Sequence, residues 1–398
     1  MTVTDPPLSF EQNTDKEIIR FTHLLNSEAW KGLLSAEQYA DREAVLGASP
    51  ISQRDRSQTM KTEFPQGYEW LGIKYFVVKD STLPATSKTS QIVSACETLN
   101  RLGWCIRPDS NGVIEPTLVV CIGGVFTAEK HRRKGYAKKM IEMLNKFYDQ
   151  IRDAPDAPPL LKNLVVNLYS EVDDYYEKVG YHSMHVPLHH VTELDEFYKV
   201  FCNNVTNKEG RYLGYDDYED LVELEKKQFK KHLSELAVKN PKSFVFTVKP
   251  DIDIFKWLED RDIFIQDKLH KGAKVPPFGF ALKDNSHIVW HHNWNASTLV
   301  IVKIFISDES SKNNSEEVLK ELMAHAVDEA KAMQLSQLQF WDEEIPLTEF
   351  PNLAKTLKHL EDDSKLYVTN GSVSAVRPPA GFDKDTIVWD NNTKFCWF

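Results

Sequence analysis

Residues 117–140 read TLVVCIGGVFTAEKHRRKGYAKKM. The part that ends at Thr127 is rich in β-branched and other apolar residues, which predicts a long, buried strand. From 135 to 151 the apolar residues recur at the i, i+3, i+4 and i+7 spacing of an amphipathic helix, which the proline-rich stretch 153–160 ends. A strand that leads through a short turn into such a helix predicts an α/β layer arrangement with a strand–helix crossover.

The turn between this strand and helix has the features of a phosphate-binding site. Backbone N–H groups at a helix N-terminus lack intrahelical partners, and the helix dipole makes that end positive. Gly135 and Ala137 would let an anion approach the backbone, while Lys130 and the run Arg132–Lys134 would attract it. An isolated string of this kind is more often a solvated basic turn, so it is the position between strand and helix that favours a phosphate cradle. The string fits neither GxGxxG nor GxxxxGK[ST], which leaves a dinucleotide-binding turn and a P-loop unsupported.

The other elements of the first half alternate in type. The first helix is built on Ile18, Ile19, Phe21, Leu24 and Leu25. In chain order we predict helices within 11–60, followed by strands at 67–80 and 91–99 on either side of a polar loop at 81–90. The strand and helix described above come next. A strand at 163–170 and a short helix at 173–181, which stops at Gly180, complete this half.

The second half repeats this order in a degenerate form. Residues 215–270 are mostly helical by pattern. They are followed by predicted strands at 278–284, 287–294 and 298–307, a helix at 315–333 and a strand at 335–341. We therefore divide the chain into a first domain at 1–200, a helical connector at 201–270 and a second domain of the same kind at 271–398.

Composition excludes several classes of protein. A chain of 398 residues predicts two or three domains. A net charge of -11 does not suit a nucleic-acid partner, and no apolar run is long enough to span a membrane or to form a secretory signal. Five cysteines without a CxxC pair predict reduced thiols in the cytoplasm, with the nucleus as a second setting, and neither disulfides nor a zinc site. The sequence leaves the oligomeric state open.

The central unit resembles the acetyl-CoA signature of the GNAT superfamily of N-acetyltransferases. That signature is R/Q-x-x-G-x-G/A after a strand ending in a V-x-T-like triplet, here Arg132 to Ala137 after Val125–Thr127. Arg133 departs from the pattern, since glycine is frequent there. LYSEVDDYYEKVGY (168–181) is similar to the tyrosine-bearing strand and helix that follow in the family. The resemblance implies a mixed, mostly antiparallel sheet flanked by helices.

A narrower resemblance points to the fungal lysine N6-acetyltransferases of lysine catabolism. It rests on 168–181, on WKGLLSAEQYADREAVL (30–46) and on the long C-terminal half. It implies transfer of the acetyl group of acetyl-CoA to free L-lysine or a related small amine. A protein lysine or N-terminal acetyltransferase and a non-catalytic acyl-CoA-binding protein are the alternatives. The resemblance implies that the pantetheine arm binds along Val125, Phe126 and Thr127. It implies that the pyrophosphate binds at Arg132, Arg133, Lys134, Gly135, Tyr136 and Ala137.

Two residues are candidates for the proton transfers. Tyr176 aligns with the family's tyrosine that protonates the departing thiolate. The alternative is that Tyr176 is a core aromatic, with Tyr175 or Tyr181 equally eligible for this role. Glu97, on a strand face with Ala95 and Leu99, is the candidate base, and a salt-bridged strand carboxylate is the equally supported alternative.

No metal site is predicted. Histidines gather at 182–190 and at 287–292, but neither group contains HExxH or a cysteine partner, and strand alternation would scatter its members. The second half also lacks the phosphate cradle, because DESSKNNSEEV (308–318) has no glycine and places Glu316 and Glu317 at the helix start, where they would repel an anion. We therefore expect this half to be catalytically silent.

Overall fold

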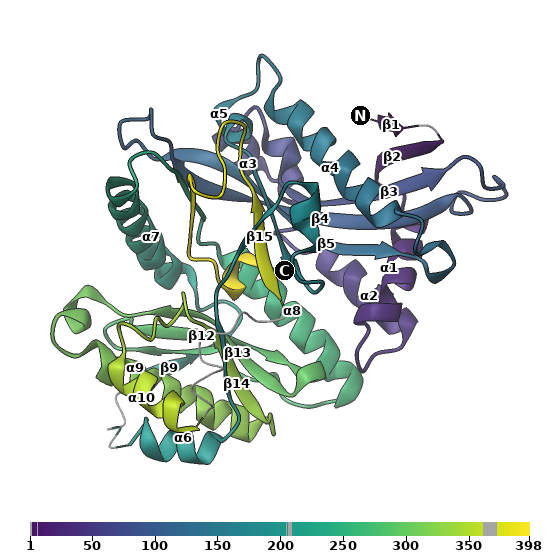
Figure 1. Cartoon of the computed structure of the whole chain (residues 1–398). Helices are drawn as coiled ribbons and strands as arrows, with labels where there is room; N and C mark the ends of the chain where they lie inside the picture. Colours follow the sequence, from purple (N-terminus) through teal and green to yellow (C-terminus); the bar gives the residue numbers. More distant parts are fainter. Residues whose placement is uncertain (1, 6, 204, 206–208, 361–371) are drawn as a thin grey trace. The chain divides into compact units, whose positions relative to one another are not determined.

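The computed structural model describes residues 2–5, 7–203, 205, 209–360 and 372–398 (Figure 1). Residue contacts divide the chain into two compact units that each collect separate segments. Unit 1 comprises Met1–Met184, His232–Lys249 and Ser374–Asp390, and unit 2 comprises His185–Lys231, Pro250–Val373 and Asn391–Phe398. The three consecutive segments 1–200, 201–270 and 271–398 do not coincide with these units, and as a division into domains they stay a prediction.

Unit 1 is built on a ten-stranded sheet. The strands that lie side by side are, in spatial order, β1 (Thr2–Asp5), β2 (Leu8–Asn13), β3 (Gly72–Asp80), β4 (Ile92–Ile106), β5 (Glu115–Thr127), β6 (Val165–Ser170), β15 (Val373–Arg377) and β7 (His182–Met184). Neighbours from β1 to β5 are antiparallel, whereas β5 and β6 are parallel. Beside the C-terminal part of β4, β10 (Phe244–Val248) pairs antiparallel, and β16 (Ile387–Asp390) pairs parallel with β10.

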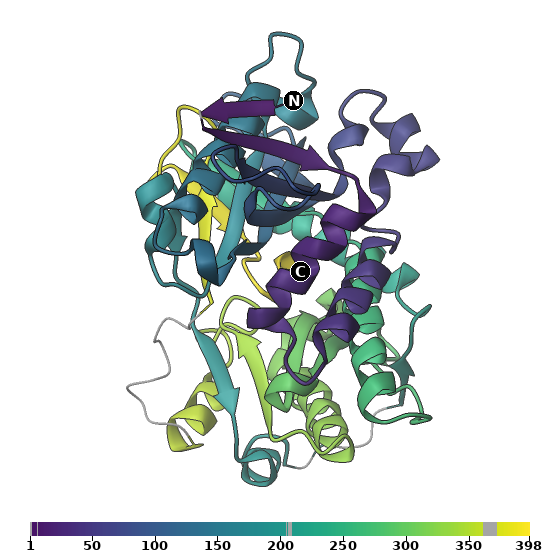
Figure 2. The same cartoon turned by 90° about the vertical axis from the view of Figure 1, so that its right-hand side faces the viewer.

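Helices cover both faces of this sheet. On one face lies α4 (Tyr136–Arg152), which buries Leu144 and Phe147 against Phe76 and Ile122. On the other lie α1 (Lys16–Trp30) and α2 (Ala36–Gly47), which run side by side (Figure 2). A capping box at Ser35 begins α2. The short helix α3 (Gln58–Glu63) lies between α2 and β3, and α5 (Pro159–Lys162) lies between α4 and β6.

The buried face of α1 differs from the apolar face that the sequence predicts. Ile18 is buried, but Ile19, Phe21, Leu24 and Leu25 are only partly so. The most buried positions include Thr22, His23, Asn26 and Ser27. Helical spacing identifies a repeating face, whereas the surface that this face meets is decided by tertiary packing. Here α1 packs on β3, β4 and β5, and these strands carry polar groups opposite the polar residues of α1.

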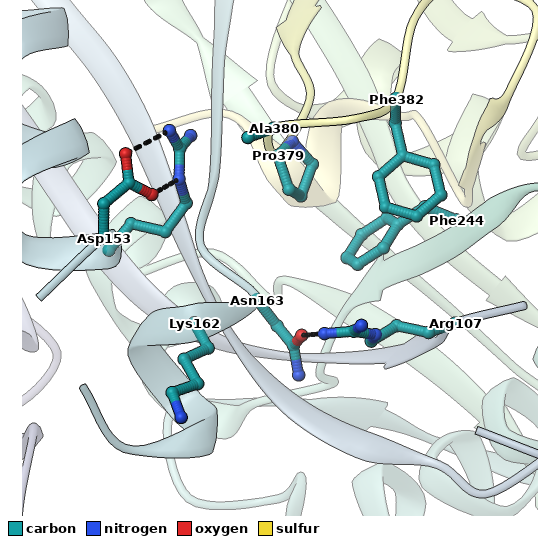
Figure 3. A pocket seen from close by; sticks show the side chains of 9 residues that line it. Arg107, Asp153, Lys162, Asn163, Phe244, Pro379, Ala380 and Phe382 are labelled. Carbon is teal, nitrogen blue, oxygen red and sulfur yellow. Dashed lines mark hydrogen bonds and ion pairs between the residues drawn. The ribbon is translucent and has the colours of Figure 1, made fainter. Parts of the chain in front are cut away.

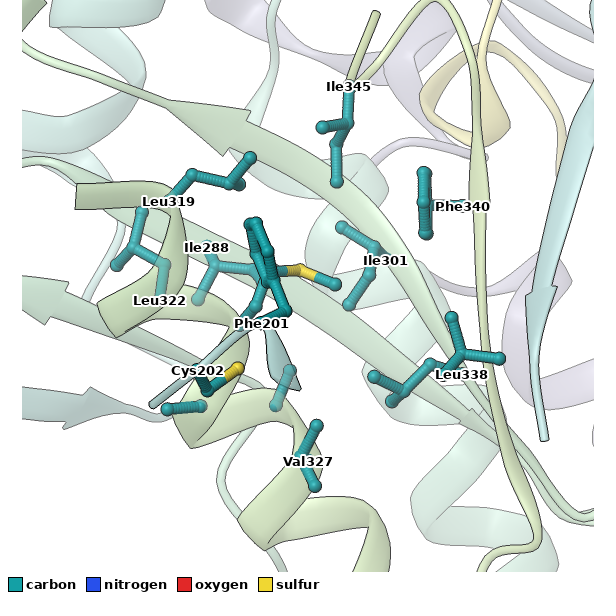
Figure 4. Close-up of a cluster of buried hydrophobic side chains, with 14 of the residues drawn as sticks. Phe201, Cys202, Ile288, Ile301, Leu319, Leu322, Val327, Leu338, Phe340 and Ile345 are labelled. Atoms are coloured by element: carbon teal, nitrogen blue, oxygen red, sulfur yellow. The ribbon is translucent and has the colours of Figure 1, made fainter. Parts of the chain in front are cut away.

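Unit 2 contains a six-stranded mixed sheet. In spatial order its strands are β8 (Leu188–Val191), β14 (Gln337–Trp341), β13 (Thr298–Phe305), β12 (His287–Asn293), β11 (Gly279–Leu282) and β9 (Gly210–Leu213). Its helices are α6 (Leu194–Val200), most of α7 (Glu219–Lys239), α8 (Ile252–Leu269), α9 (Asp308–Ala332) and α10 (Pro351–Leu360). Figure 4 shows the core where α9 packs Leu322 and Val327 against the sheet.

The two sheets share one order of elements, as the sequence predicts. In unit 1, three antiparallel strands β3–β4–β5 lead through α4 to the parallel strand β6. In unit 2, β11–β12–β13 lead through α9 to the parallel strand β14 in the same way. The predicted connector also contains β9 and β10, which the helical reading of 201–270 missed. Among the described residues, no helix combines the length and the apolar character needed to cross a membrane.

Candidate active site

The C-terminal end of β5 leaves one backbone edge without a neighbouring strand. On the β4 side, pairing continues to Thr127, whereas on the β6 side it ends at Ile122 opposite Leu168. The β4–β5 register shifts between Ala95 and Glu97, and Gly124 has a φ of 58°. A bulge of this kind bends the strand. The segment Gly123–Thr127 can therefore pair with an extended ligand as it would with another strand.

The start of α4 provides an open anion site next to this edge. Gly135, at φ 80°, precedes the helix and offers no side-chain cap to its first N–H groups. A Cβ at Gly135 would meet nothing within 4 Å, so an anion has room to approach the backbone. Arg133 adopts φ 64°, the left-handed region that favours glycine, which explains the family's frequent glycine at this position. The cradle fits a pyrophosphate group.

The side chains around the cradle divide into two groups. Arg132 and Tyr136 fasten the loop: Arg132 Nε donates to the Thr127 carbonyl at 3.1 Å, and the Tyr136 hydroxyl donates to Asp80 at 2.5 Å. The hydrogen bond to Asp80 raises the pKa of Tyr136 to about 12. In the described part of the chain, Arg133 and Lys134 are exposed and have no ion-pair partner, so their charges are available to a phosphate.

His131 also belongs to this loop, and from the sequence it is predicted only to be part of a basic turn. It is 6% exposed, and neither ring nitrogen has a hydrogen-bond partner among the described residues. Burial lowers the pKa of His131, with smaller effects from Lys130 and Lys134 in the same direction. Its ring lies edge-on to that of Tyr136, with centroids 6.1 Å apart. His131 therefore supports the loop as a neutral side chain.

Glu97 lies beside the bulge, on the face covered by α1. It is in register with Gly123 on β5 and Tyr75 on β3. Its side chain is 14% exposed, and its Oε2 lies 3.5 Å from Nε2 of His23, which is 3% exposed. Burial lowers the pKa of His23, but the neighbouring Glu97 carboxylate more than offsets this, and the net pKa is raised. The ion-paired alternative for Glu97 is thus present, and it lies next to the open edge.

Asn26 joins this group from the same helix. Its Nδ2 would lie 3.1 Å from a Cβ at Gly124, and Glu97 Cγ would lie 3.4 Å from the same point. Sequence reasoning missed both His23 and Asn26. The available signal was two polar side chains, three residues apart, on a helix otherwise marked by apolar spacing.

Tyr176 occupies a separate position after β6. It lies in a short 3-10 helix (Tyr175–Val179) and packs against the core on the α4 face. Burial raises the pKa of Tyr176, so the phenol stays protonated. The Tyr181 hydroxyl donates to Asn145 at 2.8 Å and is fully buried, which makes Tyr181 a core residue. The structure brings Glu97 to His23 and Asn26, whereas it gives Tyr176 no contact with them.

Three histidines on β12 are paired with carboxylates. His287 contacts Glu225, His291 contacts Asp262, and His292 contacts Glu329, at 2.9, 3.3 and 2.9 Å. Within the described ranges, no group of three or more His, Cys, Asp or Glu side chains is arranged to hold a metal ion.

Glu316 and Glu317 have different surroundings in unit 2. Glu316 accepts the N–H groups of Asn352 and Leu353 and so caps α10. Glu317 is exposed and pairs with Lys320. The backbone of α9 is non-helical at Asn314, so Glu316 and Glu317 lie in the first turn of the helical segment that follows this residue, as the sequence predicts. The side chains of 308–313 lie outside the described residues.

A pocket of about 120 Å³ lies at the opposite end of β5 (Figure 3). It is lined by Arg107, Arg152, Lys162, Asn163, Phe244 and Phe382, among others. Arg152 pairs with Asp153 at 2.8 Å, and Arg107 pairs with Asp109 at 2.8 Å. Because its two arginines are already neutralised and it lies away from Thr127, this pocket is not the acyl-donor site.

Comparisons with known proteins concern the fold and the family of the chain. Residues 202–398 match the family described as LYC1 GNAT-like C-terminal domain. An uncharacterised protein of Saccharomyces cerevisiae is 55% identical over 99% of this chain and 98% of its own length. A lysine acetyltransferase of Yarrowia lipolytica is 28% identical over 85% of each chain. The fold is similar to that of a GCN5-related N-acetyltransferase from Kribbella flavida, with a TM-score of 0.50, 15% identity, and coverage of 93% of this chain and 72% of that one. The fold is that of the GNAT N-acetyltransferases, and residues 202–398 belong to the LYC1 GNAT-like family.

Proposed function

We propose that the protein transfers the acetyl group of acetyl-CoA to the N6 amine of free L-lysine or a closely related small amine. One geometric observation carries the proposal. The open edge Gly123–Thr127 has the uncapped N-terminus of α4 at one end and the largely buried Glu97 carboxylate at the other. An extended acyl donor anchored by its pyrophosphate at Gly135 would direct its other end along this edge toward Glu97.

Each part of this edge has a task in direct transfer. Acetyl-CoA, when bound, supplies the thioester that an amine attacks. The backbone N–H groups that follow Gly135 hold the pyrophosphate, and the edge of β5 orients the pantetheine arm. Glu97 accepts a proton from the ammonium form of the substrate, because only a neutral amine has a lone pair with which to attack. Tyr176, kept protonated by burial, supplies a proton to the departing sulfur.

The lysine specificity rests on the relative from Yarrowia lipolytica, which is named a lysine acetyltransferase and aligns over 85% of this chain. A buried carboxylate beside the open edge is the kind of group that would receive a cationic amine. A side-chain amine presented by a protein has the same chemistry, so the test must compare free lysine with lysine in a peptide.

The decisive experiment measures thiol release from acetyl-CoA with a panel of acceptors. We expect turnover with free L-lysine and an N6-acetylated product by mass spectrometry, with ornithine slower and lysine-containing peptides inactive. Acetyl-CoA should also raise the melting temperature, because a ligand that binds only the folded state stabilises it. Faster turnover of peptides than of free lysine would instead favour a protein acetyltransferase. No thermal shift at millimolar acetyl-CoA would refute the donor assignment.

A further inference from the structure

Helix α1 places against the sheet two polar atoms that lack a hydrogen bond within the described ranges, one of which, His23 Nε2, lies within ion-pair distance of Glu97. His23 is 3% exposed and Asn26 is 4% exposed, and in the described residues neither His23 Nε2 nor Asn26 Oδ1 has a hydrogen-bond partner. Burying such atoms costs stability unless a partner is supplied. The two residues lie one turn apart on α1, so their side chains point to the same side of the helix.

Both residues lie beside the bulge of β5 and the Glu97 carboxylate. Asn26 Nδ2 would lie 3.1 Å from a Cβ at Gly124, in the bulge of β5, and His23 Nε2 lies 3.5 Å from Glu97 Oε2. A side chain at Gly124 would crowd both Asn26 and Glu97, so the glycine lets the side-chain amide and the carboxylate approach the bulge from the same side. An amine bound at the bulge would be near the two groups.

We propose that α1 completes the acceptor-amine site: Asn26 Oδ1 binds an N–H of the amine, and His23 takes up, through Glu97, the proton that the amine loses. This inference rests on the proposed function. Asn26 touches the substrate, whereas His23 acts through Glu97 and is a positioning residue for the proton transfer.

The proton balance follows from the charges of the groups. An ammonium substrate must lose two protons to become an amide nitrogen. The first passes to Glu97 and on to His23 Nε2, which then releases it to solvent between turnovers. The neutral nitrogen forms the C–N bond as the C–S bond breaks with its electron pair on sulfur. The second proton leaves the nitrogen and ends on that sulfur, directly or by exchange through Tyr176.

The groups packed around His23 determine when it can take a proton. Glu97 and Tyr75 face it from the strands, and Tyr39, Arg42 and Glu43 belong to α2. Burial lowers the pKa of His23, Glu97 and then Glu43 raise it, and Arg42 lowers it, with a net rise above the ordinary value of about 6.5. The His23–Glu97 pair can therefore accept a proton when the pH is above the raised pKa of His23. When the pH is below that pKa, His23 is already protonated.

The first test needs no turnover. NMR titration of the His23 ring should show a pKa above its usual range in the wild-type chain and a lower pKa in Glu97→Gln. Adding L-lysine in the presence of coenzyme A should shift the His23 signals in the wild type and not in Asn26→Leu. A His23 pKa that is the same in wild type and Glu97→Gln would overturn its coupling to the base.

The second test uses the pH profile of kcat/KM for the amine. His23→Gln should lower the plateau about 100-fold, the lower end of the effect of losing a proton-transfer group. It should also move the acid limb to lower pH, because the histidine with the raised pKa is then absent. His287→Gln is the matched control, since it breaks a buried histidine–carboxylate pair in unit 2 and should leave the limb in place. If His23→Gln lowered kcat/KM without moving the acid limb of the pH profile, His23 would have only a structural role.

The third test separates binding from proton transfer. Asn26→Leu should raise the KM for the amine at least tenfold with little change in the KM for acetyl-CoA, and Asn26→Asp should restore amine binding. An unchanged amine KM in Asn26→Leu would overturn the role of Asn26. A wild-type chain that releases no thiol with any amine refutes the proposed function itself, whereas an active wild type with unaffected variants overturns only this inference.

Discussion

Gly135 is the residue on which donor binding depends most directly. Its φ of 80° and the open space around its Cβ position leave the first N–H groups of α4 accessible. Gly135→Asp places a negative charge at the positive end of the helix, while aspartate tolerates the left-handed conformation. We expect this variant to lose acetyl-CoA binding in calorimetry and to stay folded. Gly135→Asn is the uncharged control and should bind about tenfold more tightly than the aspartate variant. Wild-type affinity in Gly135→Asp would place the cradle elsewhere.

Tyr176 tests the proton supply to the leaving group. Burial raises its pKa, so the hydroxyl carries its proton throughout the ordinary assay range. Tyr176→Phe removes that proton and should lower kcat roughly ten- to ten-thousand-fold, with little change in acetyl-CoA affinity. Tyr175→Phe, on the neighbouring ring 5.4 Å away, is the control and should retain activity. The assignment would move to Tyr175 or to solvent if the two variants had the opposite effects.

At the scale of the element, α10 depends on a carboxylate from another helix. Glu316 accepts two backbone N–H groups at the start of α10, which is the task of an N-cap. Glu316→Ala should therefore destabilise the protein by about 1–2 kcal/mol, and a melting-temperature drop of about 2–4 °C per kcal/mol should follow in calorimetry. Glu317→Ala removes an exposed charge paired with Lys320 and should change stability by less than about 0.5 kcal/mol. Equal effects of the two changes would contradict the capping role.

At the scale of the whole molecule, the last residues of the sequence contribute to both units. Ile387–Asp390 form β16 in unit 1, and Phe395 in unit 2 is fully buried against Phe229 and Phe255. Deleting 386–398 should give insoluble or inactive protein, although no candidate catalytic or donor-binding residue is removed. Phe395→Ala should alone cost about 3–5 kcal/mol, whereas Phe398→Ala, at a partly exposed position, should cost less. A soluble and fully active truncation would refute this packing argument.

The sequence alone was sufficient for the parts of the molecule that are local in the chain. The strand ending at Thr127, the turn through Arg132–Ala137 and the helix that follows were predicted together, because each element has its own periodicity and the turn joins them directly. The repeated order of strands in the second half was predicted for the same reason. The resemblance carried by these residues then identified the acyltransferase family.

Tertiary structure alone decided which distant residues meet. Nothing in the spacing of α1 indicates that His23 pairs with Glu97 or that Asn26 faces Gly124, because these contacts join a helix to strands far along the chain. In the same way, the pairing of β10 with β16 and the contact of Glu316 with the start of α10 join segments that are distant in the chain. Local periodicity specifies the type of an element, whereas strand pairing and the burial of polar groups depend on surfaces that exist only after the chain has folded.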